Sequence, residues 1–197
     1  MAFSKTEIIS NAITLLGNKP ILSLEGQGDM VDAAAQAFDM LLPAKLSEGF
    51  WRFATTYALL NQIQDLEIPS QMNWLYAYEL PDDYLEMVRL HPQNYNFEIF
   101  QNNVMYSNVL SPQYIEYVRE VEPDDLPPYF VHYFVYELAL YLCLSSANSA
   151  AYYAALKPER DYTLGLAMAK DAQNRPQSPL ASMPVISGRW VSTWANG

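Results

Sequence analysis

The chain has 197 residues, enough for one domain with a substantial core, and its 51% apolar content is too high for a disordered protein. Its 22 acidic residues outnumber the 11 basic ones, and the net charge of −11 argues against nucleic-acid binding, which needs clustered Lys and Arg. The single Cys143 excludes an intrachain disulfide and a multi-cysteine metal site, and its apolar neighbours predict a buried, inert thiol.

The first predicted helix begins at the capping box Ser4-Lys5-Thr6-Glu7, in which the Ser hydroxyl and the Glu carboxylate satisfy the first free backbone amides. Apolar residues follow at helical spacing from Ile8 to Leu16. Gly17 suits the position after the helix, and Pro20 prevents its continuation.

A second helix is expected from Asp29, the predicted N-cap, to Leu46, with an apolar face rich in alanine. Pro43 predicts a kink or a break within it. The preceding Gly26-Gln27-Gly28 lacks the third glycine and the upstream strand of a dinucleotide-binding loop, so it predicts a turn.

The pattern then changes to short strands rich in aromatic and β-branched residues. Asn102-Asn103 predicts a two-residue hairpin turn, because Asn tolerates a positive φ. These strands predict a small antiparallel sheet or a set of hairpins. The predicted strands are Phe50–Leu60, Trp74–Glu79, Leu85–Leu90, Phe97–Gln101, Val104–Ser107 and Gln113–Arg119.

Two more helices follow. Acidic residues and prolines between Asp124 and Pro128 open the third, and the run Phe130–Leu144 is apolar nearly all round, which places it at the centre of a bundle. It is shorter than the roughly 20 residues that a membrane span requires, and the N-terminus lacks the pattern of a signal peptide. The fourth, rich in alanine, runs from Asn148 to Ala172 and could split at Pro158.

Together these elements predict an α+β fold, mainly α: a four-helix bundle with a small antiparallel β region inserted between helices two and three, and an extended C-terminal tail. Residues 1–49 and 124–172 are expected to form the bundle. Residues 50–123 are expected to form the β-rich insertion, and residues 173–197 a docking tail.

The residues that could carry chemistry favour structural roles, and we expect no enzyme, no cofactor and no metal site. His91 and His132 lie far apart, with no second His or Cys at metal-ligand spacing. Glu137, inside the apolar helix, is expected to be paired with an Arg or a Tyr. Three carboxylate pairs leave a glycosidase open as an alternative, namely Asp82/Asp83, Glu120/Glu122 and Asp124/Asp125.

Aromatic residues favour protein partners. The 15 tyrosines are unusual in number, and Tyr and Trp are enriched at protein–protein contacts. The end of the chain carries residues typical of interface anchors. This tail is predicted either to dock into another subunit or to fold back on its own core. The predicted anchors are Arg189, Trp190, Val191 and Trp194.

Several segments in order resemble a known family. They are the turn Leu24-Glu25-Gly26 after the first helix, the alanine-rich second helix, the segment Trp51-Arg52-Phe53-Ala54, and Tyr78-Glu79-Leu80-Pro81-Asp82-Asp83-Tyr84, which matches a Y-x-L-P-x-D pattern. The strand Tyr114–Val118 and a Pro-rich entry into an apolar helix follow. Over about 150 residues, this order resembles the head-to-tail adaptors of short-tailed bacteriophages, also called tail tubular protein A or gatekeepers.

The resemblance implies a structural virion protein, made in the host cytoplasm, that forms a dodecameric ring between the portal and the tail nozzle. DNA would pass through it without specific binding, and no membrane would be involved. We expect the Trp-bearing tail to bind the portal, while a hairpin contacts the nozzle or tail fibres through Phe97, Phe100, Met105 and Tyr106. The alternatives are a small polysaccharide hydrolase that uses a carboxylate pair, or a tail assembly chaperone.

Overall fold

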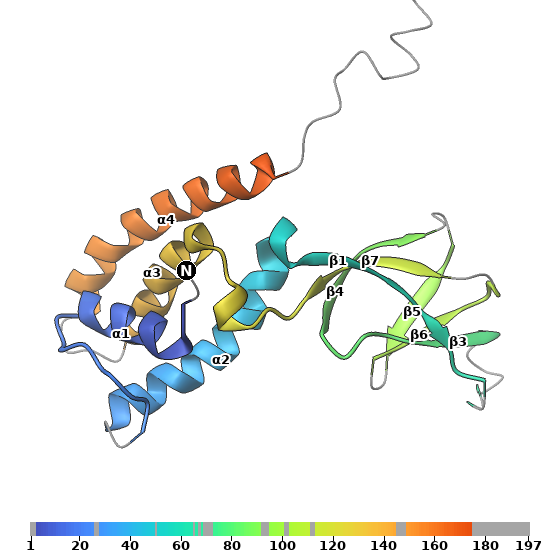
Figure 1. Cartoon of the computed structure of the whole chain (residues 1–197), viewed down its shortest axis with the longest axis horizontal. Coiled ribbons are helices and arrows are strands. Elements are labelled where there is room, and N and C mark those ends of the chain that lie inside the picture. The colour runs from blue at the N-terminus through green and yellow to red at the C-terminus, as the bar shows by residue number, and fades with distance from the viewer. Residues whose placement is uncertain are drawn as a thin grey trace, which may run out of the picture.

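Helices form one end of the molecule and strands the other in the computed structural model (Figure 1). We call the part built from α1 to α4 the helical unit, and the part built from β1 to β7 the β unit. The structure describes residues 3–25, 28–49, 51–64, 66, 68, 73–91, 95–100, 103–110, 113–144 and 149–174.

Helix α1, Lys5–Leu15, confirms the predicted capping box. The Ser4 hydroxyl accepts the Glu7 backbone N–H at 3.3 Å, and the Glu7 carboxylate accepts the Ser4 N–H at 2.9 Å. Gly17 follows the helix with a φ of +79°, and its N–H donates to the Thr14 carbonyl. The sequence therefore determines both ends of this helix.

Helix α2, Asp29–Gly49, begins one residue earlier than predicted. Gly28, with a φ of +98°, accepts the first backbone N–H groups of the helix through its carbonyl, so Asp29 is a helical residue and the expectation that it is the N-cap is wrong. The helix continues past Pro43 without a break. It ends at Gly49, a position that requires glycine because the indole of Trp51 lies where a Cβ would be.

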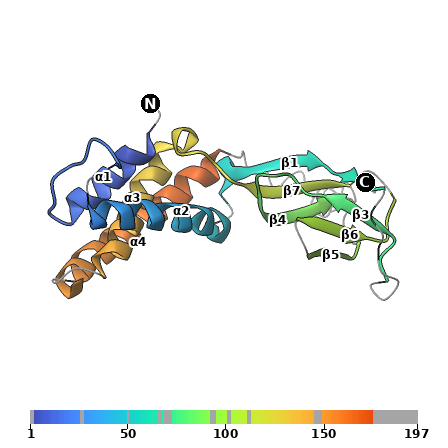
Figure 2. The ribbon, with the colours of Figure 1, turned by 90° about the horizontal axis from the view of Figure 1, so that it is seen from below.

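Helix α3, Pro128–Cys143, lies at the centre of the helical unit (Figure 2). It packs against α1, α2 and α4, which explains why it is apolar nearly all round. Helix α4, Ser149–Gln173, is continuous through Pro158 and packs mainly on α3. The largest fully buried side chains of this core are Trp51, Phe38, Phe130 and Phe134.

The β unit begins after a short 3-10 turn, η1, at Arg52–Ala54, and a second such turn, η3, at Pro123–Asp125 precedes α3. The strands between them are antiparallel to their neighbours. One sheet has the order β1-β7-β4 and the other β2-β3-β6-β5. The strands are β1 Thr55–Leu59, β2 Asn61–Gln62, β3 Tyr76–Glu79, β4 Tyr84–His91, β5 Phe97–Phe100, β6 Val104–Ser107 and β7 Tyr114–Arg119.

The expected four-helix bundle with one small β region is wrong. The seven described strands form two antiparallel sheets around a core of their own. Short strands considered one at a time could not reveal this, because the chain changes from one sheet to the other at Leu60, between β3 and β4, between β4 and β5, and between β6 and β7. The buried residues of this second core are Leu60, Tyr78, Leu80, Leu90, Met105, Ile115 and Tyr117.

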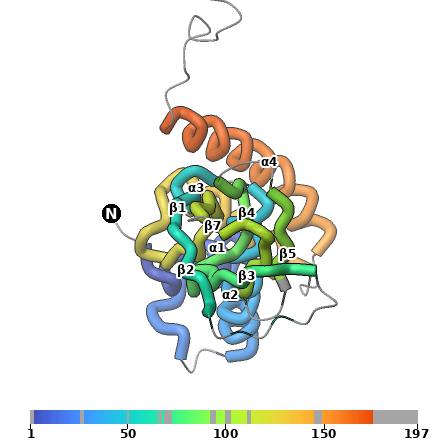
Figure 3. The backbone as a smooth tube through the Cα atoms, turned by 90° about the vertical axis from the view of Figure 1, so that its right-hand side faces the viewer, coloured from blue at the N-terminus to red at the C-terminus, as the bar shows by residue number. Residues whose placement is uncertain are grey.

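Strand β7 joins the two units. Val118 and the following Val121 belong to the core of the helical unit, whereas Ile115 and Tyr117 belong to the core of the β unit. Viewed from the β end, the strands lie in front of the helical unit and α4 runs along its outer edge (Figure 3). The molecule is therefore elongated, with its two cores arranged along the long axis.

Candidate functional site

The described residues offer little that resembles a catalytic or metal centre. Among them, no three His, Cys, Asp or Glu side chains gather closely enough to hold a metal ion. Cys143 is buried as predicted, and burial raises the pKa of its thiol. No helix in the described ranges has both the length and the apolar character needed to cross a membrane.

The predicted carboxylate pairs take different positions. Asp83 accepts a hydrogen bond from the Tyr117 hydroxyl at 2.9 Å, which assigns it a structural role. Asp124 and Asp125 are exposed on η3. Glu120 and Glu122 line a hollow of about 320 Å³.

This hollow lies between α2 and the segment that follows β7. It also contains Asp39, which pairs with Lys5 at 2.6 Å. All three carboxylates are exposed to water. A general acid that stays protonated at neutral pH usually requires burial or crowding by like charge, so solvation argues for a surface role.

Glu137 has the partners expected from its buried position. It pairs with Lys45 of α2 at 3.2 Å and with Arg160 of α4 at 3.1 Å, and it accepts from the Tyr133 hydroxyl at 3.4 Å. Burial and the Glu137 charge raise the pKa of Tyr133. Burial alone would lower the pKa of Lys45. The hydrogen bonds to Glu48 and Glu137 and the negative charges of these two residues outweigh burial, so the pKa of Lys45 is raised. These ion pairs connect α2, α3 and α4.

Asp171 is a second polar anchor, which the sequence did not reveal. It is 5% exposed and accepts the backbone N–H of Arg52 at 2.6 Å, that of Phe53 at 3.4 Å and the hydroxyl of Tyr129 at 2.9 Å. Burial and this bond raise the pKa of Tyr129. The carboxylate thus holds the end of α4 against the start of the β unit.

The predicted contact hairpin, β5–β6, exists, and part of its predicted turn, including Asn102, lies outside the described residues. Phe97 is 37% exposed, so it is available to a partner. Met105 and Tyr106 are buried in the β unit, so neither side chain offers surface in this structure. Phe100 ends β5, and its side chain lies outside the described part.

Phe97 belongs to a larger aromatic feature. A hollow of about 410 Å³, which we call the aromatic hollow, is lined by Trp74, Tyr95, Asn96, Phe97 and Glu98. The Trp74 indole N–H donates to Glu98 at 2.8 Å, which fixes the ring beside the hairpin. Trp74 and Tyr95 were not predicted as contact residues, because Trp74 precedes β3 and Tyr95 precedes β5, and these strands are distant in sequence.

The outer face of the sheet β1-β7-β4 also carries exposed rings. Tyr57 is 62% exposed, and Leu59 pairs across the sheet with Tyr114, which is half exposed. Tyr114 in turn pairs with His91 of β4. The same face carries Glu116 of the central strand, between Tyr57 and Arg89, so exposed rings and a charged pair lie together on it, a combination found in protein contacts.

Helix α4 exposes several large apolar side chains. Of its 25 residues, four are buried, namely Leu156, Thr163, Ala167 and Asp171. Tyr162 is 65% exposed and Leu166 45%, and the two lie one turn apart on one side of the helix, which we call the α4 face. Met168, 48% exposed, lies on another side of the helix. The other exposed residues of α4 include Lys157, Glu159, Asp161 and Lys170.

The predicted tail anchors, Arg189, Trp190, Val191 and Trp194, lie outside the described residues. No protein-family model matches the chain, and no curated protein matches it either. A proposal on function therefore rests on three surfaces, namely the α4 face, the aromatic hollow and the outer face of the sheet β1-β7-β4.

Proposed function

We propose that the chain is a structural virion protein: a ring-forming head-to-tail adaptor that joins the portal of a short-tailed bacteriophage to its tail nozzle. The observation that carries the proposal is the α4 face, on which Tyr162 and Leu166 are exposed one turn apart. Adjacent exposed side chains of this size are typical of contacts with other proteins, and a helix flank suits side-by-side packing of identical subunits.

The elongated shape supports the same proposal (Figure 2). An adaptor needs one surface for neighbouring copies and others for the proteins above and below. The α4 face lies on the helical unit, whereas the aromatic hollow lies on the β unit. In this proposal, the α4 face contacts neighbouring copies and the aromatic hollow contacts the nozzle or a tail fibre. The C-terminal tail contacts the portal.

The charge of the chain is consistent with a passage for DNA. Twelve copies with a net charge of −11 each would total −132. A channel lined by negative charge repels the phosphate backbone, so DNA slides past without being held.

Mass photometry of the full chain, alone and mixed with its cognate portal ring, tests the proposal. We expect a species near the monomer mass of 22.4 kDa alone. With the portal we expect the addition of about twelve copies, because the ring holds neighbours at high local concentration. A chain that leaves the portal mass unchanged at micromolar concentration would contradict the adaptor function.

One observation favours a second candidate, a polysaccharide hydrolase: Glu120, Glu122 and Asp39 line the same hollow. Two carboxylates on either side of a glycosidic bond can cleave it. Incubation of the chain with host capsule polysaccharide, followed by analysis of the released oligosaccharides, tests this function. Release that disappears in E120Q/E122Q would favour the hydrolase, and absence of release would exclude it for that substrate.

A further inference from the structure

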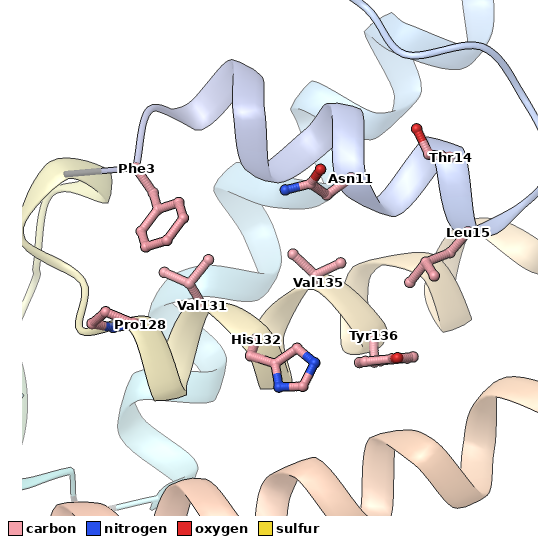
Figure 4. Close-up of a pocket in the computed structure, with 9 residues that line it drawn as sticks. All are labelled: Phe3, Asn11, Thr14, Leu15, Pro128, Val131, His132, Val135 and Tyr136. Atoms are coloured by element: carbon pink, nitrogen blue, oxygen red, sulfur yellow. The ribbon is translucent and has the colours of Figure 1, made fainter. Parts of the chain in front are cut away.

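An apolar groove of about 400 Å³ lies between α1 and α3 (Figure 4). Its floor is formed by two buried valines of α3, and polar side chains stand at its edge. None of the described residues that line it is Lys, Arg, Asp or Glu. The lining residues are Phe3, Asn11, Thr14, Leu15, Pro128, Val131, His132, Val135 and Tyr136.

The chemistry of the groove suits an aromatic side chain with one polar atom. Val131 and Val135 offer an apolar floor to a flat ring. His132 and Tyr136 stack edge to face at 5.6 Å between ring centroids, and both border the groove. The Tyr136 hydroxyl also belongs to the lining and can accept a hydrogen bond. An indole meets all of these conditions.

The described chain ends close to one end of this groove. The Asn174 amide donates to the Tyr129 hydroxyl at 3.4 Å, and Tyr129 donates to Asp171. Tyr129 is adjacent to Pro128, the lining residue at the N-terminal end of α3. Residues 175–197 therefore start beside the groove.

The remaining chain is long enough to occupy it. From Pro128 to Tyr136 the groove extends roughly 12 Å along α3. The 16 residues from Asn174 to Trp190 can span up to about 50 Å. A short tether also gives the tail an effective concentration on the order of millimolar at its own subunit, which favours binding within the chain.

The composition of the tail suits an uncharged groove on an acidic protein. Residues 176–188 carry no charge, and the segment Arg189–Trp194 supplies two indoles. All 22 acidic residues of the protein lie before Arg175, so both tail arginines are attracted to the rest of the chain.

We propose that the segment Arg189–Trp194 folds back on its own subunit and places an indole in the groove between α1 and α3. The segment is then held on the free subunit and becomes available to a partner only after it leaves the groove. This binding of the tail to its own subunit does not require the adaptor function, since it depends on the groove and the tail alone.

Disulfide trapping in the full chain tests the proposal. The variant N11C/A195C places one thiol at the groove and the other next to Trp194. The matched control, Q36C/A195C, places the first thiol at an exposed position of α2 that does not line the groove. Cys143 is buried and does not compete. Oxidation at low micromolar concentration is followed by intact mass and non-reducing gel electrophoresis.

We expect the intrachain disulfide to form at least tenfold faster in N11C/A195C than in the control, after each rate is divided by the reactivity of the same thiol toward a small disulfide reagent. Adding W190A/W194A should abolish the difference. Equal rates in the two variants, or a difference that survives removal of both indoles, would overturn the proposal. Disulfide-linked dimers as the main product would show that the tail of a second copy occupies the groove, which also overturns it.

Discussion

The two units differ in what their aromatic residues do. In the helical unit, Trp51, Phe38, Phe130 and Phe134 are buried and contact one another, with ring centroids 4.9 Å apart for Trp51 and Phe130 and 5.3 Å for Phe38 and Phe134. In the β unit, the buried rings are mainly tyrosines whose hydroxyls are hydrogen-bonded, and Tyr57, Tyr95, Phe97 and Tyr114 are exposed.

This difference separates stability from recognition. The helical core buries large apolar rings, and such burial contributes most to folding stability. The β unit has a small core and shares strand β7 with the helical unit, so it depends partly on its neighbour. Its exposed rings are free to contact other proteins. On the helical unit, the α4 face exposes Tyr162 and Leu166.

The largest expected effect on stability comes from replacing a tryptophan of the helical unit by alanine, compared with the same replacement in the β unit. Trp51 is 2% exposed and its indole N–H donates to the Lys45 carbonyl at 2.9 Å. We expect W51A to reduce the free energy of unfolding by about 3–5 kcal/mol, whereas W74A, beside the aromatic hollow, should cost less than about 1 kcal/mol. Urea denaturation measures both. Equal losses would contradict the assignment of stability to the helical core.

Removal of the Asp171 carboxylate should have the next largest effect. Three donors, the N–H groups of Arg52 and Phe53 and the hydroxyl of Tyr129, would lose their acceptor. We expect D171A to reduce the free energy of unfolding by about 2–4 kcal/mol. D171N, which keeps one carbonyl oxygen, should recover part of the loss. Thermal unfolding checks the order, and a D171A chain as stable as wild type would contradict the role of this anchor.

Two ion pairs, one in each unit, should differ in strength. Glu137 pairs with two cations in a largely buried position, whereas Arg89 and Glu116 of the β unit are 3.9 Å apart and the Arg89 side chain is half exposed. We expect E137A to cost about 1–3 kcal/mol and R89A less than about 0.5 kcal/mol. Urea denaturation at low and high salt measures both. A larger cost for R89A would reverse the comparison.

The smallest effect is a pH dependence in the β unit. Burial and the hydrogen bond to Asp83 raise the pKa of Tyr117 to about 12. Because the folded-state pKa lies above the unfolded value near 10, the contribution of this phenol is complete below pH 10 and is lost as pH rises toward 12. Unfolding free energies between pH 9 and 12 should therefore fall more steeply in wild type than in Y117F. Parallel curves would contradict this assignment.

Local features could be predicted from the sequence because neighbouring residues determine them. The capping box at Ser4, the turn at Gly17 and the central position of α3 follow from short-range pattern and were confirmed. The need of Glu137 for a partner follows from the cost of an unpaired buried charge. Prolines were less informative, since α4 is continuous through Pro158, although a split there was predicted.

Features that depend on long-range pairing could not be predicted. Whether a short strand joins one sheet or another is decided by partners far along the chain, so two sheets were mistaken for one region. The same holds for Asp171, whose role depends on backbone N–H groups more than a hundred residues away. Met105 and Tyr106 were placed at a partner surface because alternation along one strand does not show which face is covered.

The central claim is that the exposed face of α4 joins neighbouring subunits in a ring on the portal. The most direct test compares wild type, Y162R and the control Q36R by mass photometry of mixtures with the portal ring. Both substituted positions are exposed helical sites, one on the α4 face and one on α2. We predict about twelve added copies for wild type and Q36R and incomplete rings for Y162R. Full rings with Y162R, or no added copies with wild type, would contradict the claim.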